Sequence, residues 1–174
     1  AYHRELGAPN EHLRASMAIS TRSKDSDSAN AFSLARMVVP TGEMPLEERF
    51  ALIHDITLDA ARGSVSNALN AIAAVAGSLP TAVITRLARL QSQTVDFATS
   101  NVKGTPIPVY VAGSQIMSNF PIGPLAGVAF NLTLLSHVGS LDMGLNMDAR
   151  AVQRPELLTE SLARSFNRLV DLAR

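Results

Sequence analysis

The sequence predicts an α/β fold in which a mixed β-sheet is covered by helices. Short segments of alternating or largely apolar residues favour strands, and longer segments with an apolar residue every three to four positions favour helices. Their order along the chain is two strands, several helices, four strands and a last helix. That order is typical of a sandwich of sheet and helices rather than of a regular strand–helix–strand winding.

Two strands are expected near the start of the chain. Residues 13–20 alternate loosely between apolar and polar side chains, and the mostly apolar residues 32–39 are followed by Pro40-Thr41-Gly42. Residues 21–30 between them are rich in Ser, Asp and Lys, which indicates an exposed loop.

Three helices are expected next. Pro45 suits a first helical turn, and the apolar residues after it recur at helical spacing until about Arg62. We expect Gly63 to end this helix, and we expect two more helices over 64–76 and 80–94.

The second half of the chain is predicted to be mostly strand. The four predicted strands cover residues 96–102, 107–117, 125–138 and 141–147. Residues 119–124 form a turn-rich loop, and Gly139-Ser140 between the last two strands suits a tight hairpin. Pro155 then opens a final amphipathic helix.

Composition excludes several classes of function. The chain has 174 residues, about one domain, and no Cys, so it has no disulfide framework, thiolate nucleophile or Cys-based metal site. Lys+Arg and Asp+Glu are both 15, so no charge footprint points to nucleic acid. Charged residues make up only 17%, against about 25% in typical soluble domains, which predicts a surface hidden against a partner, another lobe or lipid.

The start of the chain predicts that it belongs to something larger. Residues 2–7 look like the last turn of a helix that ends at a glycine cap, without the rest of that helix before it. The sequence shows neither a secretory signal nor a run of about 20 strongly apolar residues, so we expect a cytoplasmic protein.

Self-sufficient catalytic motifs are absent from the sequence, including the G-x-S-x-G elbow, the P-loop and H-E-x-x-H. The four histidines are His3, His12, His54 and His137, and none has metal-ligand spacing to another. His137 could approach Asp142 across a hairpin turn as half of a general-base system. The alternatives are a polar pair that holds the hairpin, or two residues on opposite faces.

Polar residues also interrupt the apolar strands. Ser100 and Asn101 end one predicted strand, and Asn131, Thr133 and Ser136 lie inside another. A polar group in a central strand is costly unless it is hydrogen-bonded, so these groups either bind nearby backbone or line a substrate channel.

Several short motifs follow one another along nearly the whole chain. They are Leu-Arg-Ala at 13–15, Glu-Arg at 48–49, Thr-Ser-Asn-Val at 99–102 followed by Gly104 and Pro106, Pro-Val-Tyr-Val-Ala-Gly at 108–113, Pro-Ile-Gly-Pro at 121–124, Asn-Leu-Thr-Leu-Leu-Ser at 131–136, and Gly-Ser-Leu-Asp-Met-Gly-Leu at 139–145. In this order they resemble the C-terminal lobe of the bacterial wax ester synthase/diacylglycerol acyltransferase family. Lys103 departs from the family pattern, in which Pro is usual before the glycine.

The resemblance implies a fold and an activity. The fold would be a chloramphenicol-acetyltransferase-like, CoA-dependent acyltransferase sandwich lobe. Residues 1–174 would be the C-terminal lobe of a two-lobe enzyme, and residues 1–7 the end of a helix of the N-terminal lobe. Such an enzyme transfers a fatty acyl group from acyl-CoA, its substrate, to a diacylglycerol or a fatty alcohol, which gives triacylglycerol or wax ester, and no cofactor is expected.

The resemblance also implies that the catalytic base is elsewhere. The family's base belongs to a His-His-x-x-x-Asp-Gly motif in the N-terminal lobe, and this sequence has no adjacent His pair. We therefore expect no catalytic residue and no metal site in this chain, which alone would be inactive. Its expected contribution is one wall of the substrate tunnel, formed by Ser100, Asn101, Ala112, Gly113, Asn131 and Thr133.

The expected partners follow from this assignment. They are the N-terminal lobe with the catalytic His, acyl-CoA, and a lipid hydroxyl acceptor, with no nucleic acid. The substrates imply peripheral contact with the inner membrane face or with lipid inclusions. The alternative function is a non-catalytic lipid-binding or partner-interaction module of the same fold.

Overall fold

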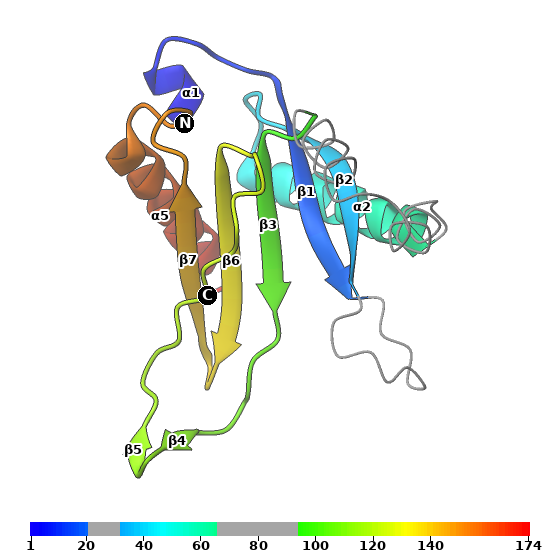
Figure 1. Cartoon of the computed structure of the whole chain (residues 1–174). Coiled ribbons are helices and arrows are strands. Elements are labelled where there is room, and N and C mark those ends of the chain that lie inside the picture. The colour runs from blue at the N-terminus through cyan, green and yellow to red at the C-terminus, as the bar shows by residue number, and fades with distance from the viewer. Residues whose placement is uncertain (21–31, 66–93) are drawn as a thin grey trace, which may run out of the picture.

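The computed structural model describes residues 1–20, 32–65 and 94–174 (Figure 1). Its main sheet has the strand order β2-β1-β3-β6-β7. The strands are β1 (His12–Ser20), β2 (Phe32–Pro40), β3 (Phe97–Val102), β6 (Phe130–His137) and β7 (Ser140–Met147). The outer pairs β1–β2 and β6–β7 are antiparallel, and β1–β3 and β3–β6 are parallel. The predicted mixed sheet is confirmed.

Three helices belong to the described residues, namely α1 (Tyr2–Glu5), α2 (Leu46–Val65) and α5 (Pro155–Leu172). The predicted helix end at Gly7 is confirmed: this residue has a positive φ of 72°, and the amide of Ala8 donates back to the carbonyl of His3. The prediction that Gly63 ends α2 is wrong, because the helix continues to Val65. A glycine inside a helix costs only about 1 kcal/mol relative to alanine, which packing of α2 on the sheet can offset.

Two predicted regions cannot be compared with the structure. The loop over 21–30 and most of the helices over 64–76 and 80–94 lie outside the described residues.

Helices α2 and α5 lie behind the sheet in the view of Figure 1. The hydroxyl of Thr57 on α2 lies 3.9 Å from the sulfur of Met37 on β2. The strand register places Met37 on the same face as Phe97 and Phe130, whose rings stack with centroids 5.0 Å apart. We call this side of the sheet the helix face. It carries most of the apolar residues of the strands.

The opposite side, which we call the loop face, is partly covered by the chain between β3 and β6. Residues 103–124, which we call the arm, leave the sheet after β3 and return over β6 and β7 (Figure 1). The amide of Asn119 in the arm donates to Asp142 on β7, which fixes the side of the sheet on which the arm lies.

The arm contains a small hairpin of β4 (Tyr110–Val111) and β5 (Ser114–Gln115). The prediction of one strand over 107–117 is therefore wrong. Ala112 and Gly113 have φ values of 50° and 83°, which reverse the chain in a two-residue turn. A similar turn at Ala126 and Gly127 delays β6 until Phe130, five residues later than predicted.

No helix among the described residues is long and apolar enough to span a lipid bilayer.

Candidate functional site

The sheet register brings three of the predicted tunnel residues together. Ser100 on β3 lies opposite Thr133 on β6, and Ala98 lies opposite Asn131. Because side chains alternate along a strand, Ser100, Asn131 and Thr133 all project from the loop face. Asn131 and Thr133 are buried, and Ser100 is half-buried.

The other three predicted tunnel residues lie elsewhere. Asn101 is exposed and lies in register with Leu134, on the helix face. Ala112 and Gly113 form the exposed turn of the β4–β5 hairpin, away from the sheet (Figure 1). The role of all six residues in a tunnel stays a prediction.

Asn131 and Thr133 have hydrogen-bond partners within the chain. The Asn131 amide donates to the carbonyl of Pro124 over 2.8 Å, and the Thr133 hydroxyl donates to Oδ1 of Asn131 over 3.0 Å. These contacts satisfy two buried polar side chains and hold the end of the arm on β6.

Three further polar side chains on the loop face bind the backbone of the arm. Oδ2 of Asp142 accepts from the amide of Asn119 at 2.6 Å, and the amide of Asn146 donates to the carbonyl of Gly123 at 3.0 Å. His137 Nε2 lies 3.0 Å from the carbonyl oxygen of Ile116. Because a carbonyl oxygen only accepts, this contact requires a proton on Nε2.

His137 and Asp142 therefore do not form a general-base pair. Both are buried on the loop face, but His137 pairs in register with Ser140 and Asp142 with Leu135. Each binds a different backbone group of the arm. Their shared function in this structure is to attach the arm to the sheet.

Glycine allows this close attachment at three points. A Cβ at Gly144 would lie 1.5 Å from the carbonyl oxygen of Pro121, and a Cβ at Gly104 would lie 1.9 Å from that of Ser136. A Cβ at Gly123 would lie within 2.7 Å of the Asn131 amide and the Thr133 hydroxyl. Gly104 and Gly144 thus let backbone lie against backbone, and Gly123 lets the arm lie against the side chains of Asn131 and Thr133.

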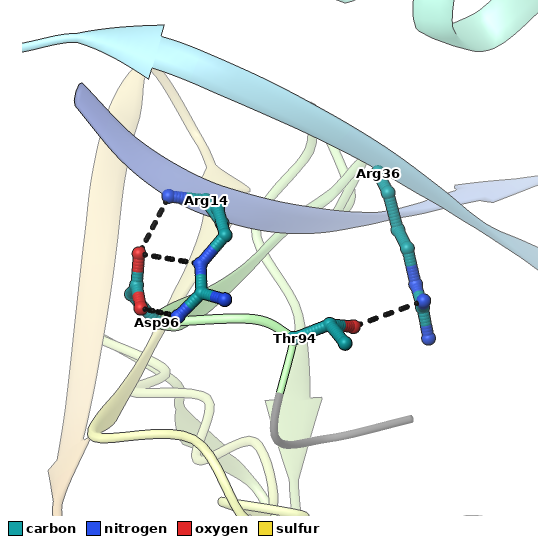
Figure 2. Close-up of polar contacts among 4 residues, drawn as sticks. All are labelled: Arg14, Arg36, Thr94 and Asp96. Atoms are coloured by element: carbon teal, nitrogen blue, oxygen red, sulfur yellow. Dashed lines mark hydrogen bonds and ion pairs between the residues drawn. The ribbon is translucent and has the colours of Figure 1, made fainter. Parts of the chain in front are cut away.

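Sequence reasoning did not single out the ion pair that joins β1 to the start of β3. The Arg14 guanidinium donates to both carboxylate oxygens of Asp96, at 2.5 and 3.2 Å, and the Arg14 amide donates to Oδ2 at 2.7 Å. Figure 2 shows the two side chains facing each other, with Thr94 turned toward Arg36 on β2, whose Nη1 donates to it over 3.1 Å.

This ion pair shifts the titration of both partners. Hydrogen bonding to Arg14 lowers the pKa of Asp96 below its usual 3.8, against the opposing effect of burial, and the same contact raises the pKa of Arg14. A charged residue near the start of a predicted strand, Arg14 in 13–20, was the available signal. The sequence around Arg14 did not indicate its partner, Asp96, which lies 82 positions further along the chain.

The arm has an apolar surface that projects outward. Residues 104–141 contain no Asp, Glu, Lys or Arg. The large apolar side chains that are exposed on the arm are Ile107, Tyr110, Val111, Met117, Phe120 and Ile122. Their exposed fractions reach 76% at Met117 and 77% at Ile122. Exposed large apolar side chains that occur together on one segment are typical of a place where a partner or a lipid binds.

The described fold matches two solved proteins over nearly the whole of this chain. The structure superposes on a wax ester synthase/diacylglycerol acyltransferase from Marinobacter aquaeolei VT8 with a TM-score of 0.67 and 21% identity, over 97% of this chain and 38% of that one. The starter condensation domain of rhizomide synthetase gives a TM-score of 0.55 at 13% identity, over 98% of this chain and 39% of that one. The chain therefore has the fold of the CoA-dependent acyltransferases.

Residues 28–170 match the sequence model of the family described as WS/DGAT C-terminal domain. The chain belongs to this family, as the motif resemblance predicted. A Mycobacterium tuberculosis (strain H37Rv) protein named as a diacylglycerol O-acyltransferase is 29% identical over 173 residues, which are 99% of this chain and 35% of that protein. A second protein of that strain with the same named activity is 25% identical, over 94% of this chain and 37% of that protein. The chain thus spans about a third of the length of these relatives.

Proposed function

We propose that this chain is the C-terminal, tunnel-forming lobe of an acyl-CoA-dependent O-acyltransferase that makes triacylglycerol or wax ester. The family membership and the named activities of the relatives support this proposal. The relatives are about three times as long, which leaves room for an N-terminal lobe with the His-His-x-x-x-Asp-Gly motif. In this chain, His137 and Asp142 are both engaged by the arm, which leaves the base to that other lobe.

The observation that carries the proposal is the way the arm is fastened. Hydrogen bonds from β6 and β7 hold its backbone on the loop face, while its large apolar side chains point outward. An exposed apolar surface without charged residues from 104 onward, attached to the sheet by hydrogen bonds, fits contact with a second lobe and with fatty substrates. We assign the second lobe as the occupant of this surface, because two-thirds of the length of the relatives lies outside this chain.

The reaction that we propose is direct transfer. The histidine of the other lobe removes the proton of the acceptor hydroxyl as its oxygen attacks the thioester carbon, the carbon–sulfur bond breaks, and the CoA thiolate takes the proton. Ser100 on the loop face is the candidate in this chain for a hydroxyl that hydrogen-bonds substrate, because Asn131 and Thr133 already bind the arm and each other. Peripheral contact with a membrane or with lipid inclusions would bring the acceptor to the tunnel.

The test is an acyl-transfer assay on a two-lobe protein, in which this chain follows an N-terminal lobe that contains the His-His-x-x-x-Asp-Gly motif. Radiolabelled palmitoyl-CoA is offered with dioleoylglycerol or with hexadecanol. We expect labelled product from the two-lobe protein, none after the second His of the motif is changed to Ala, and none from the 174-residue chain alone. A two-lobe protein that folds and transfers to neither acceptor would contradict the proposal.

Substitutions on the loop face test the tunnel wall. We expect Ser100→Ala to lower kcat of the two-lobe protein several-fold without changing its melting temperature, because its half-buried hydroxyl makes no hydrogen bond to the arm in the part of the chain that the structure describes. Asn101→Ala tests the neighbouring residue, whose side chain is exposed. Asn167→Ala on α5 is the matched control, because Asn167 is also exposed. Equal activity of all three variants would exclude Ser100 and Asn101 from the site.

The exposed apolar side chains also favour a second candidate, a non-catalytic lipid-binding module. This candidate predicts that the 174-residue chain alone cosediments with phosphatidylcholine vesicles and that Met117→Ser with Ile122→Ser prevents it. If the arm instead contacts a second lobe, the isolated chain stays in the supernatant and the two-lobe protein is active.

A further inference from the structure

The arm is fastened to one half of the loop face. Within the described part of the chain, its hydrogen bonds to the sheet go to β6 and β7, at one side of the strand order (Figure 1). The other half, which we call the open half of the loop face, is formed by β1, β2 and β3. Its large apolar side chains on β2, Leu34 and Val38, are 47% and 54% exposed.

Ser16 on β1 carries a buried hydroxyl in this open half. The register pairs it with Ala98 of β3, and so places it on the same face as Ser100. Ser16 is only 8% exposed, yet its side chain makes no hydrogen bond with the residues that the structure describes. Among those residues, the one fully enclosed side-chain atom without a partner is Nε of Arg49, so the Ser16 hydroxyl keeps access to the surface. A buried polar group is normally hydrogen-bonded, so this hydroxyl calls for an acceptor from outside the described residues.

Ser100 on β3 adds a second hydroxyl of the same kind. It is half-buried, lies opposite Ala18 in the register, and likewise has no hydrogen-bond partner for its side chain in the described ranges. Standard strand geometry places Ser16 and Ser100 about 8 Å apart on neighbouring strands. The other two corners of this square are Ala18 and Ala98, whose side chains are too small to separate the hydroxyls.

The chemistry of the open half favours an uncharged ligand. Its two arginines, Arg14 and Arg36, are engaged by Asp96 and Thr94. The groups that remain are two neutral donors beside exposed apolar side chains such as Leu34. A ligand with neutral acceptor oxygens on fatty chains matches them, and an ester carbonyl is such an acceptor.

We propose that Ser16 and Ser100 donate hydrogen bonds to the ester carbonyls of the acceptor and so select a diacylglycerol over a fatty alcohol. A diacylglycerol has two ester carbonyl oxygens beside its reacting hydroxyl, whereas a fatty alcohol has no oxygen other than that hydroxyl. A site built to hydrogen-bond its substrate rejects an analogue without the matching group, because its own polar groups are then left unpaired. This inference rests on the proposed function and names the residues that decide between its two acceptors.

The test compares three acceptors in the two-lobe protein: dioleoylglycerol, the corresponding dioleyl glycerol diether, which lacks both ester carbonyls, and hexadecanol. We expect Ser16→Ala to raise KM for dioleoylglycerol about fivefold, the effect of losing one neutral hydrogen bond. KM for the diether and for hexadecanol should not change. The melting temperature should not fall either, because the Ser16 hydroxyl has no partner to lose among the described residues.

Ser161→Ala is the matched control. Ser161 is also a buried serine, but it lies on α5 and its hydroxyl accepts from Arg164. This variant should leave all three KM values unchanged. The proposal is overturned if Ser16→Ala leaves KM for dioleoylglycerol unchanged, or if it raises KM for the diester and the diether equally, since the carbonyls are then not what the serine recognises.

A binding measurement separates this inference from the proposed function. Dioctanoylglycerol, a soluble diacylglycerol, is titrated by calorimetry into the two-lobe protein in which the second His of the motif is changed to Ala. Binding that Ser16→Ala weakens and Ser161→Ala does not supports the inference even where no acyl transfer is detected. Absent binding, or equal binding by the two serine variants, contradicts it, while transfer to dioleoylglycerol would still support the proposed function.

Discussion

The buried amide of Asn131 links the sheet to the arm. It donates to Pro124 and accepts from Thr133, so its removal leaves one carbonyl and one hydroxyl without a partner. We expect Asn131→Ala to lower the free energy of unfolding by about 1–3 kcal/mol. Urea unfolding of the variant and of the exposed control Asn167→Ala measures this difference. Equal midpoints for the two variants would show that the contact is not stabilising.

The Arg14–Asp96 pair predicts a pH dependence. The pKa of Asp96 is lowered in the folded chain, so the pair contributes stability above the usual pKa of 3.8, and this contribution is lost as pH falls through the folded pKa. Asp96→Asn should therefore destabilise the chain at pH 6, and the difference from the wild type should shrink below about pH 4. Urea midpoints between pH 2 and 6 test this prediction.

The control for that experiment is Asp59→Asn, which removes an exposed carboxylate paired with Arg62 on the same helix. Surface pairs of this kind contribute about 0–1 kcal/mol, so the control should follow the wild-type curve closely. If the difference in urea midpoint between Asp96→Asn and the wild type stays constant down to pH 2, the charge of the carboxylate is not what stabilises the fold.

At the scale of elements, the β6–β7 hairpin has a strained turn. Val138 and Gly139 both have positive φ, 43° and 81°, and a β-branched side chain is unfavourable in that region by about 1–2 kcal/mol. Asn tolerates this conformation, so Val138→Asn should raise the free energy of unfolding by about 1 kcal/mol. Val111→Asn, on exposed strand β4, should give no gain. Thermal unfolding of the two variants separates turn strain from a general effect of the polar side chain.

At the scale of the whole molecule, the apolar side chains of the arm predict a dependence on a second lobe. Phe120→Ser should reduce assembly and activity of the two-lobe protein at least tenfold, because it removes an exposed apolar contact, yet leave the melting temperature of the isolated chain nearly unchanged. The control is Leu172→Ser, an exposed apolar residue at the end of α5. Copurification of separately expressed lobes measures assembly, and equal copurification of the two variants would assign the arm another partner.

The amino-acid sequence alone determined the class of fold, the strands of the main sheet and the family. Periodicity located β1, β2, β3 and β7 to within about one residue, because apolar alternation is a local property of the chain. The motifs in series identified the C-terminal lobe, although the turns at Ala112-Gly113 and Ala126-Gly127 were missed. Alanine at positive φ gives little signal in a sequence.

Only the tertiary structure decided what the polar residues inside the strands contact. The sequence left both a functional and a structural interpretation open for Asn131, His137 and Asp142, and in the structure each binds the backbone of the arm. The tertiary structure also showed that Arg14 pairs with Asp96. Such contacts join residues that are far apart along the chain. Periodicity is a local property of the sequence, so it predicts the face on which a side chain lies but not the group that the side chain contacts.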